Sequence, residues 1–165
     1  MIWVVDVWLL HKSSESSADP VARASQRFLS SLQVDGGIAL SQEVMAAYSP
    51  AVDALGARFG GKWFASMSKL EGKIDYVFDP EPEECGELRA ALTGGNLPFE
   101  FDHDDVPYVV LARRSPDRHL ISGDVGDGDF AAGCTQWLRD NWGVCFHDIE
   151  PNVPYHCARH ACLAK

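Results

Sequence analysis

Short apolar runs alternate along the chain with segments in which apolar residues recur every three or four positions. The runs are typical of buried strands, and the segments are typical of helices that bury one face. The strands expected from this pattern cover residues 2–7, 36–41, 74–78, 119–124 and 144–149. The helices expected cover residues 20–32, 42–48, 82–94, 104–115 and 133–143. A further helical region is expected over residues 50–72, weakened or broken at Gly60 and Gly61.

The order of these elements predicts the fold class. Strands that alternate with helices form a parallel sheet covered on both faces, so we expect an α/β fold with three layers, α/β/α, around a central parallel sheet. The length of 165 residues and the 46% of hydrophobic residues fit one globular domain with a real core. We expect this domain to cover residues 1–150 and a C-terminal tail to cover residues 151–165.

Composition narrows the classes of function. Lys and Arg number 14 against 24 Asp and Glu, a formal net charge of −10, which argues against a protein held on nucleic acid by bulk electrostatics. An enzyme that contacts nucleic acid briefly stays possible, because an acidic metal site is itself negative. The opening "MIWVVDVWLL" is too short to span a bilayer and lacks a basic leader region, so we expect a cytoplasmic protein with no membrane association. The five cysteines are expected to be reduced.

Asp6 is the most informative single residue. It interrupts an apolar strand, where an ionised carboxylate carries a desolvation cost of several kcal/mol unless it is paired or binds a metal. It also lies near the C-terminal end of that strand, where open parallel sheets bind their ligands. The structural alternative is an acid that caps a backbone amide or pairs with an arginine.

Three further acids occupy similar places. Glu43 follows the expected helix cap Ser41, and Asp105 stands where the helix "DDVPYVVLA" begins. Asp124 ends the strand "HLISGD". Singly, the helix-start acids are explained by capping and by the helix dipole. Together with Asp6 they place carboxylates at one edge of a parallel sheet, and carboxylate oxygens are the ligands that Mg²⁺ or Mn²⁺ prefers.

The ordered pieces "WVVDVWLL", "SQEVMAAY", "DDVPYVVLA" and "HLISGDVGDGDF" resemble a PIN domain, the fold of a family of metal-dependent nucleases. The resemblance covers roughly residues 2–150. The family's acidic residues fall on Asp6, Glu43, Asp105 and Asp124. Asp105 fits better than its neighbour Asp104 because Ala112 then lies seven residues later, as in the family's helix.

The resemblance implies a hydrolase, a divalent-metal-dependent endoribonuclease that cleaves RNA with Mg²⁺ or Mn²⁺. Asp6, Glu43, Asp105 and Asp124 would be catalytic, and Asp129 would join Asp6, Asp105 and Asp124 as a metal ligand. Small PIN domains are often the toxin of a toxin–antitoxin pair and form homodimers, so an antitoxin protein and a homodimer are implied partners.

The chain departs from the family pattern in two places. Trp8 stands where members often have a small polar residue, two positions after the first acid. The usual compact "GDxDF" is stretched to "GDVGDGDF", so that Asp127 or Asp129 takes the role of the second acid. Asp129 is favoured because Phe130 follows it.

Other interpretations of the acids account for less. The segment "DVGDGDFAAGCT" lacks the Gly and Glu that a calcium loop needs at positions six and twelve. A phosphatase of the DxDxT type needs an acid at position 8, and no P-loop motif is present. A Toprim-like arrangement would use Asp127 and Asp129 but leaves Asp6 unexplained. The tail residues His156, Cys157, His160 and Cys162 match no familiar zinc spacing.

A basic stripe is the remaining candidate feature. If one helix continues through Gly60 and Gly61, its face carries four cations that would contact a phosphate backbone: Arg58, Lys62, Lys69 and Lys73. A solvated helix face is the alternative explanation. For the whole chain, the alternative to a nuclease is a non-catalytic PIN-like module that acts through protein contacts and uses its acids as helix caps.

Overall fold

A computed structural model of the chain describes residues 1–78, 82–95, 97, 104–123 and 132–149. Within these residues the strands are β1 (Ile2–Val5), β2 (Gly37–Leu40), β3 (Ile74–Tyr76), β4 (His119–Ser122) and β5 (Cys145–Asp148). They form one sheet in the order β3-β2-β1-β4-β5, and every pairing is parallel. Each strand lies inside a run where the sequence predicts one, and the expected parallel sheet is confirmed.

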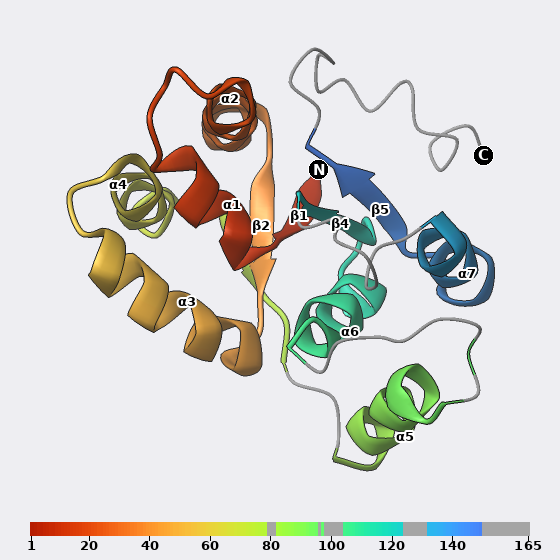
Figure 1. Ribbon diagram of the computed structural model, residues 1–165. Coiled ribbons are helices and arrows are strands. Elements are labelled where there is room, and N and C mark those ends of the chain that lie inside the picture. The colour runs from red at the N-terminus through yellow and green to blue at the C-terminus, as the bar shows by residue number, and fades with distance from the viewer. Residues whose placement is uncertain (79–81, 96, 98–103, 124–131, 150–165) are drawn as a thin grey trace.

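Helices cover both faces of the sheet. They are α1 (Val7–Ser13), α2 (Pro20–Asp35), α3 (Gln42–Leu55), α4 (Phe59–Met67), α5 (Pro82–Thr93), α6 (Val106–Arg114) and α7 (Ala132–Trp142). Helices α1 to α4 gather on one side of the sheet and α5 to α7 on the other (Figure 1). The central strands β1, β2 and β4 are buried on both faces, which explains the continuous apolar runs of β1 and β2. The three-layer α/β/α architecture is therefore as predicted.

The strand order defines where a site is expected. From β1 the chain moves outward in one direction to β2 and β3, and then returns to place β4 and β5 on the other side of β1. The order therefore reverses between β1 and β4. In open parallel sheets this switch point leaves a crevice beyond the C-terminal ends of the two strands, where ligands bind. Asp6 follows β1 at this edge.

Helix α1 was not expected from the sequence. The apolar run continues past Asp6 as "VWLL", which favours an extension of the strand. In the structure β1 ends at Val5, and the Asp6 side chain accepts a hydrogen bond from the backbone N–H of Trp8 as the N-cap of α1. Leu9 and Leu10 are fully buried, so the run stays apolar because it packs into the core as a helix.

The expected helix break at Gly60 and Gly61 is wrong. Helix α3 runs through Pro50 and ends at Gly56, whose φ of 49° is accessible to glycine at little cost. Gly60 and Gly61 lie inside α4 and are buried. A Cβ on Gly60 would lie 2.3 Å from the carbonyl oxygen of Leu10. Gly60 therefore allows α4 to approach α1 closely, and Gly61 allows it to approach Gly56 at the end of α3.

Two further observations complete the fold. Cys134 and Cys145 are buried and neither forms a disulfide within the described residues, and the reduced state of the five cysteines stays a prediction. Among the described residues, no helix is long and apolar enough to cross a membrane. The expected tail, residues 151–165, lies outside the described residues.

Candidate functional site

Asp6 lies at the switch point and is held on three sides. Its backbone N–H donates to the carbonyl oxygen of Ile121 on β4, at 3.0 Å. Its Oδ1 accepts from the backbone N–H of Trp8 at 3.0 Å, and its Oδ2 accepts from the hydroxyl of Ser122 at 2.5 Å. Only 5% of the residue is exposed. The carboxylate is thus fixed between the ends of β1 and β4, in the position where a parallel sheet builds a site.

Asp105 stands at the same edge, because α6 precedes β4 and therefore begins where β4 ends. It occupies the N-cap position of α6, yet its side chain makes no capping hydrogen bond. Capping of α6 therefore does not explain why an acid stands at position 105. The residue is half-buried, whereas its neighbour Asp104 is exposed.

Tyr108 lies one turn along α6 from Asp105, on the same face of the helix. It is 4% exposed, and within the described residues no acceptor lies in hydrogen-bonding geometry for its hydroxyl hydrogen, although the backbone N–H of Val7 lies near the hydroxyl oxygen. Burial raises the pKa of the Tyr108 hydroxyl far above its usual value, the charge of Asp6 raises it further, and the backbone amide of Val7 lowers it. Smaller contributions from Asp105 and Asp104 act in the same direction as Asp6. Tyr108 is therefore a neutral hydroxyl among carboxylates.

Glu43 lies in the first turn of α3, directly after β2 and thus at the same edge of the sheet. Ser41 caps that helix through its hydroxyl, as expected, so Glu43 is not the cap. The Glu43 carboxylate is 42% exposed and forms an ion pair with the guanidinium of Arg89 on α5. In this structure the charge of Glu43 is balanced by an arginine rather than shared with Asp6.

The described residues bring only part of the expected carboxylate set together. Among them, no group of three or more His, Cys, Asp or Glu side chains is close enough to hold a metal ion. Asp124, Asp127 and Asp129 lie outside the described residues, so their roles stay predictions. Ser122, which ends β4, lies at the edge where Asp6 lies, and Asp124 follows it two positions later in the sequence.

Trp8 takes a structural role at this edge. Its indole ring covers Gly123, where an added Cβ would lie 2.3 Å from Cζ3 of the ring. Trp8 therefore contributes its backbone N–H to Asp6 and its ring to the end of β4. The side-chain contact that a small polar residue would make at position 8 is replaced by packing.

The expected basic stripe does not form on one helix. Arg58 is the N-cap of α4 and Lys62 lies within it, whereas Lys69 and Lys73 follow its end at Met67. The Lys73 ammonium instead donates to the carbonyl oxygens of Val34 and Gly36, each at 2.9 Å, near the C-terminal end of α2. Substrate contact by these cations stays a prediction without the shared helical face that motivated it.

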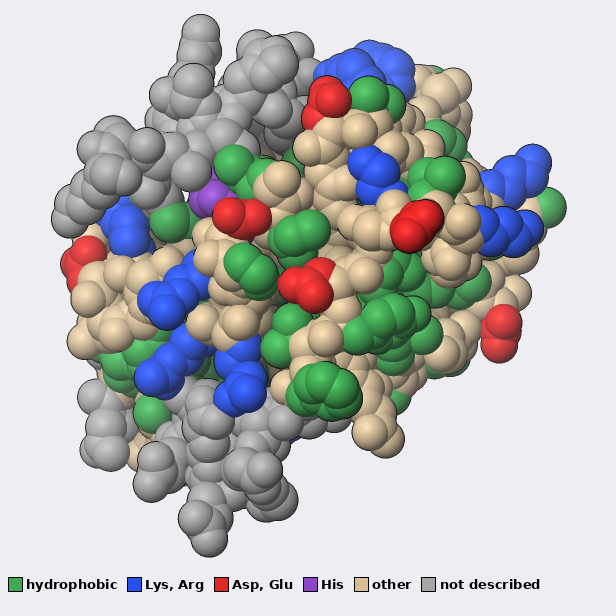
Figure 2. All heavy atoms as spheres, turned by 180° about the vertical axis from the view of Figure 1, so that it is seen from behind, with side chains coloured by type: hydrophobic (Ala, Val, Ile, Leu, Met, Phe, Trp, Pro, Cys, Tyr) green, Lys and Arg blue, Asp and Glu red, His purple; other side chains and the backbone are tan. Residues whose placement is uncertain are grey.

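Arginines also lie around the C-terminal ends of α6 and α7. Arg113 and Arg114 occupy the last turn of α6, and Arg139 the last turn of α7. The guanidinium of Arg113 lies 4.9 Å from the centre of a ring of Trp142. Several Lys and Arg side chains are visible together on this side of the molecule when it is seen from behind (Figure 2). This basic region is at the opposite end of α6 from Asp105.

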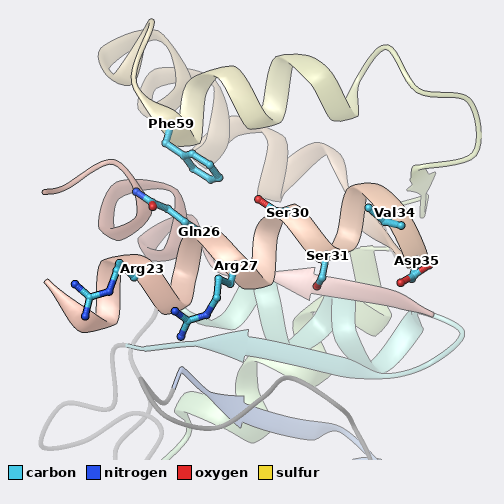
Figure 3. A pocket seen from close by; sticks show the side chains of 8 residues that line it. All are labelled: Arg23, Gln26, Arg27, Ser30, Ser31, Val34, Asp35 and Phe59. Atoms are coloured by element: carbon cyan, nitrogen blue, oxygen red, sulfur yellow. The ribbon is translucent and has the colours of Figure 1, made fainter. Parts of the chain in front are cut away.

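An open hollow of about 640 Å³ lies on a different surface, along α2 and beside the start of α4 (Figure 3). It is lined by Arg23, Gln26, Arg27, Ser30, Ser31, Val34, Asp35 and Phe59. None of the acids expected at the site lines it. The hollow and the carboxylate edge are therefore separate features.

Comparisons with known proteins identify the fold. No protein-family model and no curated protein matches this sequence. One similar chain comes from the crystal structure of VapBC2 from Rickettsia felis bound to a DNA fragment from the VapBC2 promoter. Its TM-score to this chain is 0.54 and its sequence identity is 13%. The alignment covers 91% of this chain and 100% of that chain. The fold is PIN-like. At this sequence identity the similarity establishes the fold alone, and any catalytic activity has to be argued from the side chains of this chain.

Sequence reasoning missed two residues of this edge, Ser122 and Tyr108. For each of them the sequence contains a feature that indicates its place in the site. Ser122 is the polar residue that ends the otherwise apolar run of β4, two positions before Asp124. Tyr108 lies three residues after Asp105, which places both on one face of the expected helix.

Proposed function

We propose that the protein is a divalent-metal-dependent endoribonuclease that cleaves phosphodiester bonds in RNA. The observation that carries the proposal is Asp6, a buried carboxylate fixed at the switch point of a PIN-like sheet by Trp8 and Ser122. Asp105, which makes no capping bond, lies at the same edge. These features support a site that needs negative charge at a defined place.

The chemistry of the donors fits Mg²⁺ or Mn²⁺. Both ions prefer carboxylate oxygens and keep several waters, so a few acids at one edge suffice without thiols or imidazoles. We assign Asp6 and Asp105 as metal ligands from the described residues, and Asp124 and Asp129 as further ligands. We assign Glu43 as a catalytic residue. The buried Tyr108 hydroxyl, whose hydrogen has no acceptor in the described structure, is a polar group suited to face such an ion's waters.

The chain's own residues fix the geometry for this chemistry. The Ser122 hydroxyl and the Trp8 amide orient the Asp6 carboxylate, as second-layer hydrogen bonds do for metal ligands generally. Glu43, which is paired with Arg89 in this structure, would accept a proton from the attacking water once that pair is released. A bound divalent ion supplies charge neutralisation at the phosphate and lowers the pKa of a coordinated water.

Partners follow from the same comparison. The structural neighbour is VapBC2, crystallised with promoter DNA. By analogy we propose that this chain is the toxin of a toxin–antitoxin pair, with an antitoxin protein as partner and a homodimer as its assembly. The basic region at the C-terminal ends of α6 and α7 is at the opposite end of α6 from Asp105, so it is separate from the edge where RNA would be cut.

A non-catalytic interaction module is the competing function, and two contacts favour it. Asp6 caps α1, and Glu43 is ion-paired with Arg89, so both acids have structural partners. Capping alone, however, does not require an acid that is buried between two strands, because exposed Ser, Thr or Asn caps a helix equally well.

Cleavage of end-labelled RNA and single-stranded DNA, with Mn²⁺, Mg²⁺ or EDTA, tests the proposal. We expect RNA to be cut with either metal and cleavage to stop when EDTA removes the ion, because the acids alone do not neutralise charge on the phosphate. A mixed pool of single-stranded and structured RNA avoids dependence on one target. RNA cleavage that is unchanged in EDTA would contradict the metal-dependent mechanism.

A further inference from the structure

Tyr108 is a buried polar group whose hydroxyl hydrogen the fold leaves without an acceptor in the described residues. The hydroxyl is inaccessible, and the residue as a whole is 4% exposed. Buried hydroxyls in native proteins are almost always hydrogen-bonded, because leaving one unpaired destabilises the folded state. A position that retains such a hydroxyl, where phenylalanine would fit, calls for a functional explanation.

The nearby acceptors bind other donors, and the backbone N–H of Val7, which lies near the Tyr108 hydroxyl, can only donate to it. Oδ1 of Asp6 accepts from Trp8, and Oδ2 accepts from Ser122. The carbonyl oxygen of Val5 accepts from the hydroxyl of Tyr48, the other buried tyrosine of this region. Tyr48 thus shows how the same side chain behaves when its role is structural: its hydroxyl is fully buried and bonded to the backbone.

The surroundings of Tyr108 are those of the proposed site. It lies on the same face of α6 as Asp105, and α6 packs against β1, the strand that ends before Asp6. Its hydroxyl is protonated at neutral pH, since burial and the charge of Asp6 both raise its pKa. A protonated hydroxyl beside carboxylates is a hydrogen-bond donor in a place that otherwise offers acceptors.

We propose that Tyr108 is a positioning residue whose hydroxyl would donate a hydrogen bond to a water molecule of the divalent ion that Asp6 and Asp105 would hold. The inference rests on the proposed nuclease function and extends it to a residue outside the carboxylate set. It explains why the hydroxyl hydrogen lacks an acceptor among the described residues, because that acceptor would arrive with the metal. Outer-layer contacts of this kind orient the ligands of metal sites and are worth about 10- to 100-fold in metal affinity or activity.

The test compares Tyr108→Phe with Tyr48→Phe, which removes an equivalent buried hydroxyl from the same region. For Tyr108→Phe we expect the melting temperature of the metal-free protein to stay the same or rise, since the hydroxyl hydrogen has no described acceptor to lose. Its Kd for Mn²⁺ by calorimetry should weaken by about 10- to 100-fold, and RNA cleavage should fall by a similar factor. For Tyr48→Phe we expect a lower melting temperature and a Kd for Mn²⁺ within about twofold of wild type, because Tyr48 holds the backbone of β1 and not the ion.

The outcomes separate this inference from the proposed function. If the wild type binds Mn²⁺ and cuts RNA but Tyr108→Phe does both equally well, Tyr108 is not a positioning residue and the nuclease assignment stands. A lowered melting temperature with unchanged Mn²⁺ affinity would likewise assign Tyr108 a structural role. If the wild type binds no Mn²⁺, the proposed function fails and this inference fails with it.

Discussion

Asp6→Asn is expected to reduce metal-dependent RNA cleavage by more than about a hundredfold while leaving the fold intact. Loss of an outer-layer contact already lowers activity by about 10- to 100-fold, and loss of a ligand charge has a larger effect. Asparagine keeps an oxygen for the amide of Trp8 and is as good an N-cap as aspartate. Its amide nitrogen can donate to Ser122, whose hydroxyl now binds Oδ2. Cleavage rate and melting temperature, measured on the same preparation, separate the two effects.

Two control variants sharpen this result. Asp6→Ala removes the cap as well as the charge, so its free energy of unfolding should fall by about 0.5–2 kcal/mol, unlike that of Asp6→Asn. Asp53→Asn removes one negative charge from an exposed position in α3 and should cut RNA at the wild-type rate. Full activity in Asp6→Asn would contradict the assignment of Asp6 to the site.

Gly60→Ala is expected to destabilise the protein by about 1–3 kcal/mol or more, as overpacking of a tight contact does. Helix propensity alone predicts the opposite, since alanine in a helix is favoured over glycine by about 0.5–1 kcal/mol. The structure reverses the sign because the new Cβ would lie 2.3 Å from the carbonyl oxygen of Leu10. That contact is with backbone, so relief requires α4 to move away from α1. The free energy of unfolding from urea denaturation measures the effect.

Gly86→Ala is the matched control, because Gly86 is an exposed residue inside α5 where an added Cβ would have no neighbouring atom within 4 Å. At this position only helix propensity changes, so Gly86→Ala should be more stable than the wild type by about 0.5–1 kcal/mol. Stabilisation by both substitutions would show that α1 and α4 are not as close as the structure places them.

The parts of the fold that follow from local periodicity were predictable. Strands β1 and β2 are continuously apolar, and the alternation of strands with helices favours a parallel sheet. The N-cap Asp19 and Pro20 of α2 were also readable, since both residues act within one turn. Helix α1 could not be predicted from the sequence, because "VWLL" is apolar at every position and so shows no helical periodicity.

The break between α3 and α4 and the partners of the acids depend on tertiary contacts instead. Gly60 reads as a helix breaker, yet it lies inside α4 because α1 packs directly against it. The sequence placed Asp6 and Glu43 at one edge of the sheet correctly. It carried no sign of Arg89, which is 46 residues from Glu43, or of Ser122, which is 116 residues from Asp6. Such pairings arise from the order of the strands and not from spacing along the chain.

Binding of Mn²⁺ by isothermal titration calorimetry tests the central claim most directly, because helix caps have no affinity for a divalent ion and a nuclease site does. The wild type should bind Mn²⁺, and Asp105→Asn should bind it at least about tenfold more weakly, since one ligand charge is lost. Absence of binding by the wild type, or equal affinity in Asp105→Asn, would contradict the account and favour a PIN-like module that acts through protein contacts.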